Sequence, residues 1–93
     1  MKRVLLKSGA FVRTARRLVK KTPRLVDSIL EVLNSLESDA FDASLKTHKL
    51  KGELAGSWAC SAGYDLRIVF EFVEHEGSEA ILLQSIGTHD EVY

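Results

Sequence analysis

Hydrophobic positions in the first third of the chain recur every three or four residues, the spacing of one face of a helix. A short apolar run at residues 4–6 comes first and ends before Ser8, which indicates a strand at or near the edge of a sheet. Ser8 suits a helix cap. The apolar positions that follow it are Phe11, Val12, Ala15, Leu18 and Val19. We therefore predict a strand and then a helix that buries one face.

A second helix is predicted to begin at Thr22 and Pro23 and to run to about Glu37. Threonine would cap it, and proline would take the first helical position, where its missing N–H costs nothing. Its apolar stripe comprises Val26, Ile29, Leu30, Leu33 and Leu36. Because each helix has a single apolar stripe, we expect a helix hairpin on one face of a sheet.

After the acidic link of residues 38–42, short segments separated by glycines indicate antiparallel strands. The clearest is residues 65–73, which alternates between two faces. The positions predicted to face the helices are Leu66, Ile68, Phe70 and Phe72. Asp65 and Arg67 would then share the opposite, open face. The last strand, Ala80 to Ile86, is almost entirely apolar, and we expect it in the interior of the sheet.

The segment before residue 62 is expected to pair with this alternating strand as a hairpin, in one of two registers. A two-residue turn would place Trp58 and Cys60 beside Arg67, whereas a three-residue loop at residues 62–64 would place them in the core. We favour the second, because burying Trp58 is worth a few kcal/mol. That register also sets Ser61 on the open face with Arg67.

The chain has 93 residues, enough for a single domain spanning 1–93. With 45% hydrophobic and 28% charged residues it is expected to be a soluble globular protein. No apolar run approaches the roughly 18 residues of a membrane helix, and the first six positions are too short for a signal-peptide core. We expect a cytoplasmic protein. Cys60 is the sole cysteine, and we expect a buried, inert thiol.

Charge is distributed unevenly along the chain, although the formal net charge is +0. Every charge from Lys2 to Arg24 is positive, and residues 27–42 carry only acids. The neutral total argues against a protein that coats nucleic acid generally, but the basic part would attract a phosphate-rich partner. The alternative is that these cations merely form the solvated face of a helix.

Three segments carry a resemblance to a known family. Residues 46–52 contain His48-x-Leu50-x-Gly52, residues 64–70 form the Tyr-Asp-Leu-Arg strand, and residues 87–93 read Gly-Thr-His-Asp-Glu-Val-Tyr. In the order strand, two helices and antiparallel strands, they resemble the RelE/ParE toxin superfamily, and the nearest branch looks like YafQ. The resemblance covers almost the whole chain. It implies an α+β, RelE-like fold, with an N-terminal strand and a two-helix hairpin on a mostly antiparallel four- or five-stranded sheet.

The resemblance also implies a function. Members of this branch are antitoxin-controlled endoribonucleases, or mRNA interferases, that cut messenger RNA on the ribosome. We therefore expect a toxin of a type II toxin-antitoxin system with two partners, a cognate antitoxin and ribosome-bound mRNA. We expect a monomer when the toxin is free and a hetero-oligomer with the antitoxin. No cofactor and no metal is implied.

Residue by residue, the two histidines of the family's motifs match His48 and His89, and its strand aspartate matches Asp65. Its C-terminal aromatic residue matches Tyr93. Arg67 matches the arginine that RelE-like members use against the scissile phosphate. The resemblance thus implies a catalytic set on the later strands and the tail.

Physical chemistry gives these residue types suitable roles. Metal-free RNA cleavage needs a base for the 2′-OH proton, donors for the growing phosphate charge and an acid for the departing 5′-oxygen. Histidine titrates near neutrality and can act as either base or acid, and Arg67 offers a rigid fork to phosphate oxygens. Asp65 can orient a histidine or take a proton, and Tyr93 can stack on a base. The expected RNA contacts are Lys46, Lys49, Lys51 and Ser61.

Each assignment has a simpler alternative. His48 beside lysines is typical of an exposed loop, and Asp65 with Arg67 could be a surface ion pair worth under about 1 kcal/mol. The lysines could be a solvated edge that discourages aggregation, and Tyr93 could be a packed terminus. His-x-x-x-His spacing is absent from the sequence, so no metal site is predicted.

The sequence also departs from the branch. Ser61 stands where YafQ-like members tend to have another histidine, and Ser85-Ile86 replaces an arginine before Gly-Thr-His. These departures leave open a weaker activity, a different acid-base assignment or an inactive binding protein. A further alternative is a ParE-like toxin that inhibits a topoisomerase on the same fold and needs no proton-transfer residues.

Overall fold

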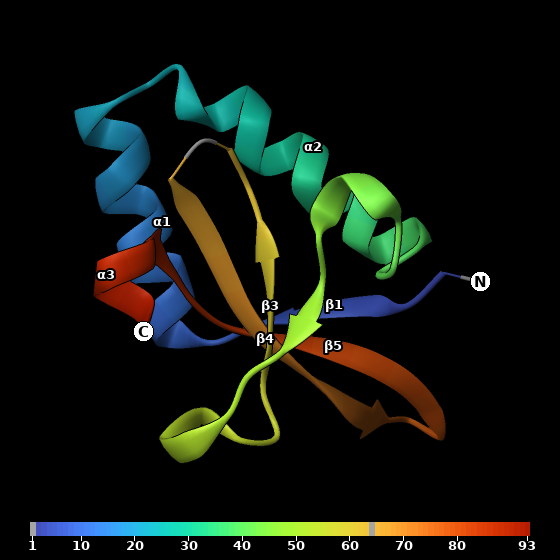
Figure 1. Ribbon diagram of the computed structural model, residues 1–93. Coiled ribbons are helices and arrows are strands. Elements are labelled where there is room, and N and C mark those ends of the chain that lie inside the picture. Colours follow the sequence, from blue (N-terminus) through green and yellow to red (C-terminus); the bar gives the residue numbers. More distant parts are fainter. Residues whose placement is uncertain (1, 64) are drawn as a thin grey trace.

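The computed structural model describes residues 2–63 and 65–93, which form a five-stranded sheet with helices packed against it (Figure 1). The strands are β1 (Val4–Lys7), β2 (His48–Lys49), β3 (Trp58–Ser61), β4 (Leu66–His75) and β5 (Ser78–Thr88). The helices are α1 (Gly9–Lys21), α2 (Leu25–Ser38) and α3 (His89–Val92), with short 3-10 turns η1 (Ala43–Leu45) and η2 (Gly52–Leu54). The strand order is β1-β5-β4-β3-β2. Among the described strands, β1 alone pairs in parallel, with β5, so the predicted α+β class with a mostly antiparallel sheet is confirmed.

The first helix starts where the sequence predicts. The Ser8 side chain accepts a hydrogen bond of 3.0 Å from the Phe11 N–H and caps α1. The predicted start of α2 is wrong by two residues, because Thr22 closes α1 and α2 begins at Leu25. The Thr22 N–H donates to the Leu18 carbonyl at 2.8 Å, and its own carbonyl accepts from Leu25 at 3.0 Å. None of the described helices is long and apolar enough to cross a membrane.

The hydrophobic core lies between the helix hairpin and one face of the sheet. The predicted stripes supply it, since Phe11 of α1 and Leu36 of α2 are buried there. From the sheet come Ile68 and Phe70 of β4 and Ile81 of β5, each 0% exposed. The alternation predicted for β4 is therefore confirmed, and the other face of the sheet is left without helices α1 and α2 (Figure 1).

Trp58 and Cys60 face the core, as the favoured register predicted. Cys60 lies opposite Ile68, and Ser61 lies opposite Arg67 on the open face. Cys60 is 0% exposed, and burial raises the pKa of its thiol to about 12. The expectation of a buried cysteine is thus confirmed.

The β3–β4 hairpin nevertheless closes two residues further along β4 than predicted. The Ala62 N–H donates to the Leu66 carbonyl at 2.8 Å, whereas the predicted loop set Ser61 opposite Asp65. A shift of two residues leaves every side chain on its face, so the face assignment survives. Asp65 itself precedes β4 and is exposed, and its predicted place on the strand is wrong. Tyr64, part of the predicted loop, lies outside the described residues.

The strand β5 lies between β1 and β4, which confirms its interior position and the edge position of β1. Its pairing with β4 shifts at one point. Val69 lies opposite Ser85 and Phe70 opposite Leu83, so Gln84 is the extra residue of a β-bulge. The Gln84 carbonyl accepts a 3.0 Å hydrogen bond from the Ser8 hydroxyl. The cap of α1 is thereby tied to the bulge.

Candidate functional site

Three of the predicted site residues, His48, Ser61 and Arg67, lie on the open face of the sheet in rows that cross the strands. Ser61, Arg67 and Gly87 are neighbours across β3, β4 and β5. In the next row, His48 of β2 lies opposite Ala59, which is followed by Val69 of β4 and Ser85 of β5. His48 and Arg67 therefore share one face, with Cα atoms roughly 12 Å apart across two strand spacings.

The Arg67 guanidinium is anchored to the β3–β4 hairpin. Its Nη1 donates to the Leu66 carbonyl at 3.0 Å, the Gly63 carbonyl at 3.3 Å and the Ser61 hydroxyl at 3.4 Å. Ser61, which stands where the family tends to have a histidine, thus contacts the arginine. These contacts hold the fork of Arg67 at the start of β4, where a phosphate can approach it from the open face.

Two reciprocal hydrogen bonds cap the N-terminus of the short helix α3. The Thr88 hydroxyl accepts from the Glu91 N–H at 3.3 Å, and the Glu91 carboxylate accepts from the Thr88 N–H at 2.8 Å. This reciprocal capping box starts the helix at His89. Hydrogen bonds from Thr88 lower the pKa of Glu91, and Arg17 and Lys21 of α1 lower it further. The last helix therefore lies close to the basic side of α1.

A close approach at Gly87 fixes α3 over the sheet. A Cβ atom at this buried residue would come within 3.2 Å of Glu91 Cβ and 3.3 Å of Val92 Cγ1. The glycine of the Gly-Thr-His motif thus leaves room for the side chains of α3 to pack closely against the strand that pairs with Arg67. The motif places a helix, in addition to supplying a histidine.

The ring of His89, the first residue of α3, contacts the ring of Tyr93, which directly follows the helix. Their ring centroids are 4.5 Å apart with planes at 89°, an edge-to-face pair. Burial raises the pKa of Tyr93, and the Arg67 guanidinium acts on it in the opposite direction, so the phenol and the arginine are close enough to interact. The structure therefore brings His89, Tyr93 and Arg67 to one end of the open face.

His48 is exposed, and its ring is oriented by a local hydrogen bond. Nδ1 lies 2.9 Å from the Lys46 carbonyl, which can only accept, so Nδ1 carries the proton when the ring is neutral. Nε2 then presents a free lone pair to solvent. A neutral imidazole in this tautomer is ready to accept a proton.

The predicted RNA-binding lysines do not all face the same way. Lys49 lies opposite Trp58 and its Nζ is 5.4 Å from the centre of the indole ring, a cation–π contact on the helix side of the sheet. Lys46 and Lys51 are exposed on either side of β2. Lys49 therefore lies on the opposite face from His48, because neighbouring residues of a strand point to opposite faces.

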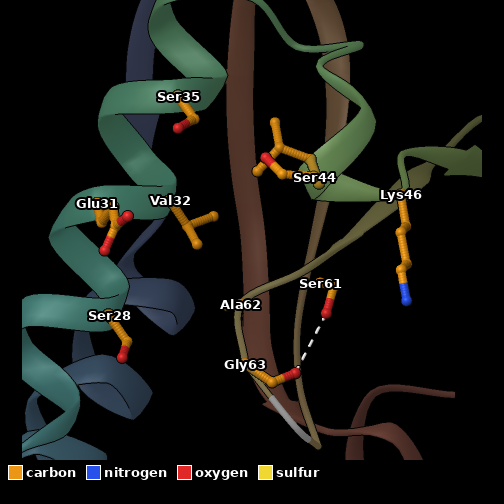
Figure 2. Close-up of a pocket in the computed structure, with 10 residues that line it drawn as sticks. Ser28, Glu31, Val32, Ser35, Ser44, Lys46, Ser61, Ala62 and Gly63 are labelled. Carbon is orange, nitrogen blue, oxygen red and sulfur yellow. Dashed lines mark hydrogen bonds between the residues drawn. The ribbon is translucent and has the colours of Figure 1, made fainter.

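A polar cleft of about 350 Å³ lies between α2 and the β3–β4 hairpin (Figure 2). Figure 2 shows Ser28 and Glu31 of α2 on one side of it and Lys46 on the other. Ser61 and Gly63 line its end, where the Ser61 hydroxyl donates to the Gly63 carbonyl at 3.1 Å. The cleft and the Arg67 guanidinium thus share the hairpin as a common wall.

A second cavity of about 310 Å³ opens beside Tyr93. Its other lining residues are Leu50, Lys51, Glu53 and Leu54, from the segment that follows His48. The two motifs of the sequence therefore meet in space, since the tail packs against the turn after β2.

One polar network on the open face was not predicted. The Ser57 hydroxyl donates to Gln84 Oε1 at 2.8 Å, and Gln84 Nε2 donates to Glu71 Oε2 at 3.2 Å. Alternation along β4 places Glu71 on this face, but the β-bulge turns Gln84 toward it, and nothing in the hydrophobic pattern marks a bulge. The network joins β4 and β5 to the residue that precedes β3.

A two-helix hairpin on one face of the sheet, with histidines, an arginine and a tyrosine on the other, defines a toxin of the RelE/ParE superfamily. The YafQ family model, "Bacterial toxin of type II toxin-antitoxin system, YafQ", matches residues 3–93. The chain belongs to this family. A sequence search of curated proteins finds no significant match.

Solved toxin structures share the fold at low sequence identity. YafQ from E. coli strain BL21(DE3) is 16% identical, covers 99% of both chains and has a TM-score of 0.79. A YoeB/ParE toxin from Agrobacterium tumefaciens is 17% identical, covers 92% of this chain and 98% of its own, and has a TM-score of 0.77. The toxin in the E. coli DinJ–YafQ toxin-antitoxin complex is 17% identical, covers 100% of this chain and 99% of its own, and has a TM-score of 0.76.

Proposed function

We propose that this toxin is an endoribonuclease that cuts messenger RNA on the ribosome, in the cytoplasm, without a metal ion. The observation that supports it best is the meeting of His89, Tyr93 and Arg67 at one end of the open face, with His48 on the same face. A toxin that only blocked a protein would have no need of two histidines and an arginine around an open surface.

In the proposed reaction the 2′-oxygen forms a bond to the adjacent phosphorus while the bond from phosphorus to the 5′-oxygen breaks. One histidine, His48 or His89, removes the 2′-OH proton, and the other protonates the departing 5′-oxygen. Arg67 neutralises the charge that builds up on the phosphate. Asp65, exposed beside the hairpin, is the carboxylate that can orient a histidine from outside the strand.

We expect the RNA backbone to follow Lys46, Ser61 and Lys51. Lys46 and Ser61 line the cleft between α2 and the β3–β4 hairpin, and Lys51 lines the cavity next to Tyr93. Contacts of this kind bind phosphate by charge and weaken as salt is added. Lys49, whose charge lies over Trp58, has no part in this path.

The cognate antitoxin is expected to cover the groove between α1 and α2 and to form a hetero-oligomer with an otherwise monomeric toxin. Two adjoining cavities, of about 350 and 430 Å³, share Ala15, Arg16 and Ile29. Leu30 at the rim is 54% exposed, and the cations there include Lys20. An amphipathic helix with acidic flanks complements an apolar floor with a basic rim.

Cleavage mapping on translating ribosomes tests the nuclease proposal directly. Wild-type toxin should cut messages, and each single substitution should slow cutting while the protein stays folded. The variants are His48→Ala, Asp65→Ala, Arg67→Ala and His89→Ala. Growth arrest with uncut messages, or arrest that survives loss of both histidines, would contradict the proposal and favour a topoisomerase inhibitor of the ParE kind.

A further inference from the structure

The cavity beside Tyr93 combines features that suit a single planar base. Leu50 and Leu54 are half-buried and supply apolar wall, and the Tyr93 ring, 42% exposed, supplies an aromatic surface. Unpaired RNA bases bind to proteins by stacking on such rings and by hydrogen bonds along their edges. The volume of about 310 Å³ is large enough for one nucleotide base.

The polar residues of the cavity differ in sign, and each suits a different part of a nucleotide. Lys51 is a cation and suits phosphate oxygens, while Glu53 is an exposed carboxylate and can only accept hydrogen bonds when ionised. Exocyclic amino groups of adenine, cytosine and guanine donate to a carboxylate. Uracil has no amino group, and its one ring donor, N3–H, lies between two carbonyl oxygens that repel a carboxylate.

The position of the cavity relates it to the proposed cleavage site. The lining segment Leu50–Leu54 directly follows β2, which holds His48 on the open face. Tyr93, which also lines the cavity, contacts His89, and the positive charge of Arg67 acts to lower the pKa of its phenol. A base in this cavity therefore has its own phosphate within reach of the residues proposed to act on it.

We propose that this cavity is a base-selecting subsite, in which a base next to the cleaved phosphate stacks on Tyr93 and Glu53 selects bases with an exocyclic amino group against uracil. The proposal rests on the proposed function, since it names the substrate feature read at that site. Glu53 is a specificity residue and takes no part in bond breaking.

The test measures binding and cleavage separately. Short RNAs that differ only at the base beside the target phosphate are prepared with a 2′-deoxy sugar at the cleavage point, so that they bind and cannot be cut. Binding is followed by NMR through the methyl groups of Leu50 and Leu54, and cleavage of matched messages is mapped on ribosomes. Glu53→Gln is compared with Glu74→Gln, an exposed glutamate at the far end of β4.

Wild type should bind RNAs with an amino-bearing base about tenfold more tightly than the uracil RNA. Glu53→Gln should bring these affinities within about twofold, because an amide both donates and accepts. Glu74→Gln should keep the wild-type preference. A preference that Glu53→Gln leaves unchanged, that Glu74→Gln also removes, or that wild type lacks would overturn the subsite. Base-selective binding without any cleavage would overturn the nuclease and leave the subsite standing.

Discussion

The two faces of this sheet support different kinds of surface. On the helix side, the groove between α1 and α2 has an apolar floor, with Leu30 exposed at its rim. On the open side, Arg67 and His48 are polar residues held on strands, and α3 is their only helical cover among the described elements. Apolar grooves gain free energy by excluding water, whereas polar sites work through fixed donors and acceptors.

The difference teaches that antitoxin binding and RNA cleavage, as proposed here, place separate physical requirements on the two faces. A groove tolerates exchange of one apolar side chain for another of similar size, because its interactions lack direction. A phosphate site does not tolerate such an exchange, because it depends on the direction of its donors. The Arg67 guanidinium is held in one direction by three contacts to the hairpin. The comparison therefore predicts variants that damage one face and spare the other.

The largest effect is expected at Arg67. Arg67→Ala should lower the rate of message cleavage by about 10²- to 10³-fold, the usual loss when a donor to a charged transition state is removed. Binding of the antitoxin, measured by calorimetry, should stay within about twofold of wild type if the faces are independent. A matched loss of antitoxin affinity would show that the antitoxin covers the open face instead.

A smaller effect is expected on the helix side. Leu30→Asp places a charge where we expect an apolar contact, and antitoxin affinity should fall roughly 10- to 100-fold. Asn34→Asp, exposed one turn further along α2, is the matched control and should lose much less. Cleavage by both variants should equal that of wild type. Slower cleavage by Leu30→Asp would join the two faces into one functional surface.

A roughly tenfold loss of cleavage is expected for Gly87→Ala, because its Cβ would press on the Glu91 and Val92 side chains of α3 and shift His89 and Tyr93. Gly9→Ala is the control, since its Cβ would meet only the mobile end of Arg13 at 3.2 Å. Loss of the contact between the His89 and Tyr93 rings should be visible by NMR. Cleavage at the wild-type rate with a displaced α3 would show that the residues of the tail take no part in cleavage.

The smallest effect is expected when folded toxin is treated with an alkylating reagent for Cys60, which lies in the buried core under the sheet. Burial raises the pKa of its thiol to about 12, so the thiol stays protonated and unreactive up to that pH in the folded state. Alkylation at pH 8 should therefore proceed only as fast as the protein opens. Rapid labelling of folded toxin would mean that the buried core is not closed.

The helices and strands with strong periodicity could be predicted from the sequence. The residue at which α2 begins and the point at which the β3–β4 hairpin closes could not. The α1 cap at Ser8 and the burial of Ile68 and Phe70 follow from residue type and spacing. The start of α2 does not, because Thr22 is suited to two caps and only packing decides between them. Asp65 was misplaced for a related reason, since alternation fixes the face of a strand but not where the hairpin closes.

The candidate site divides in the same way. Arg67 falls on the open face, as the alternation of its strand predicts, and the pairing of β2 brings His48 to the same face. His89 lies on α3, where its ring contacts Tyr93. The orientation of Lys49 toward Trp58 and the network through Gln84 depend on pairing partners and on a bulge. Such features arise from contacts between segments far apart in the chain, which periodicity does not report.

The parallel pairing of β1 with β5 has a consequence for how the protein is made. Ser8 and Gln84, which are hydrogen-bonded, lie 76 positions apart, and closing a loop of that length costs on the order of 4 kcal/mol of chain entropy. The first helix packs mainly on β5, and α3 follows directly after it. The ribosome must therefore synthesise β5 before α1 can pack on it and before α3 can begin. A nascent chain that lacks β5 has no strand for the first helix to pack on and no last helix.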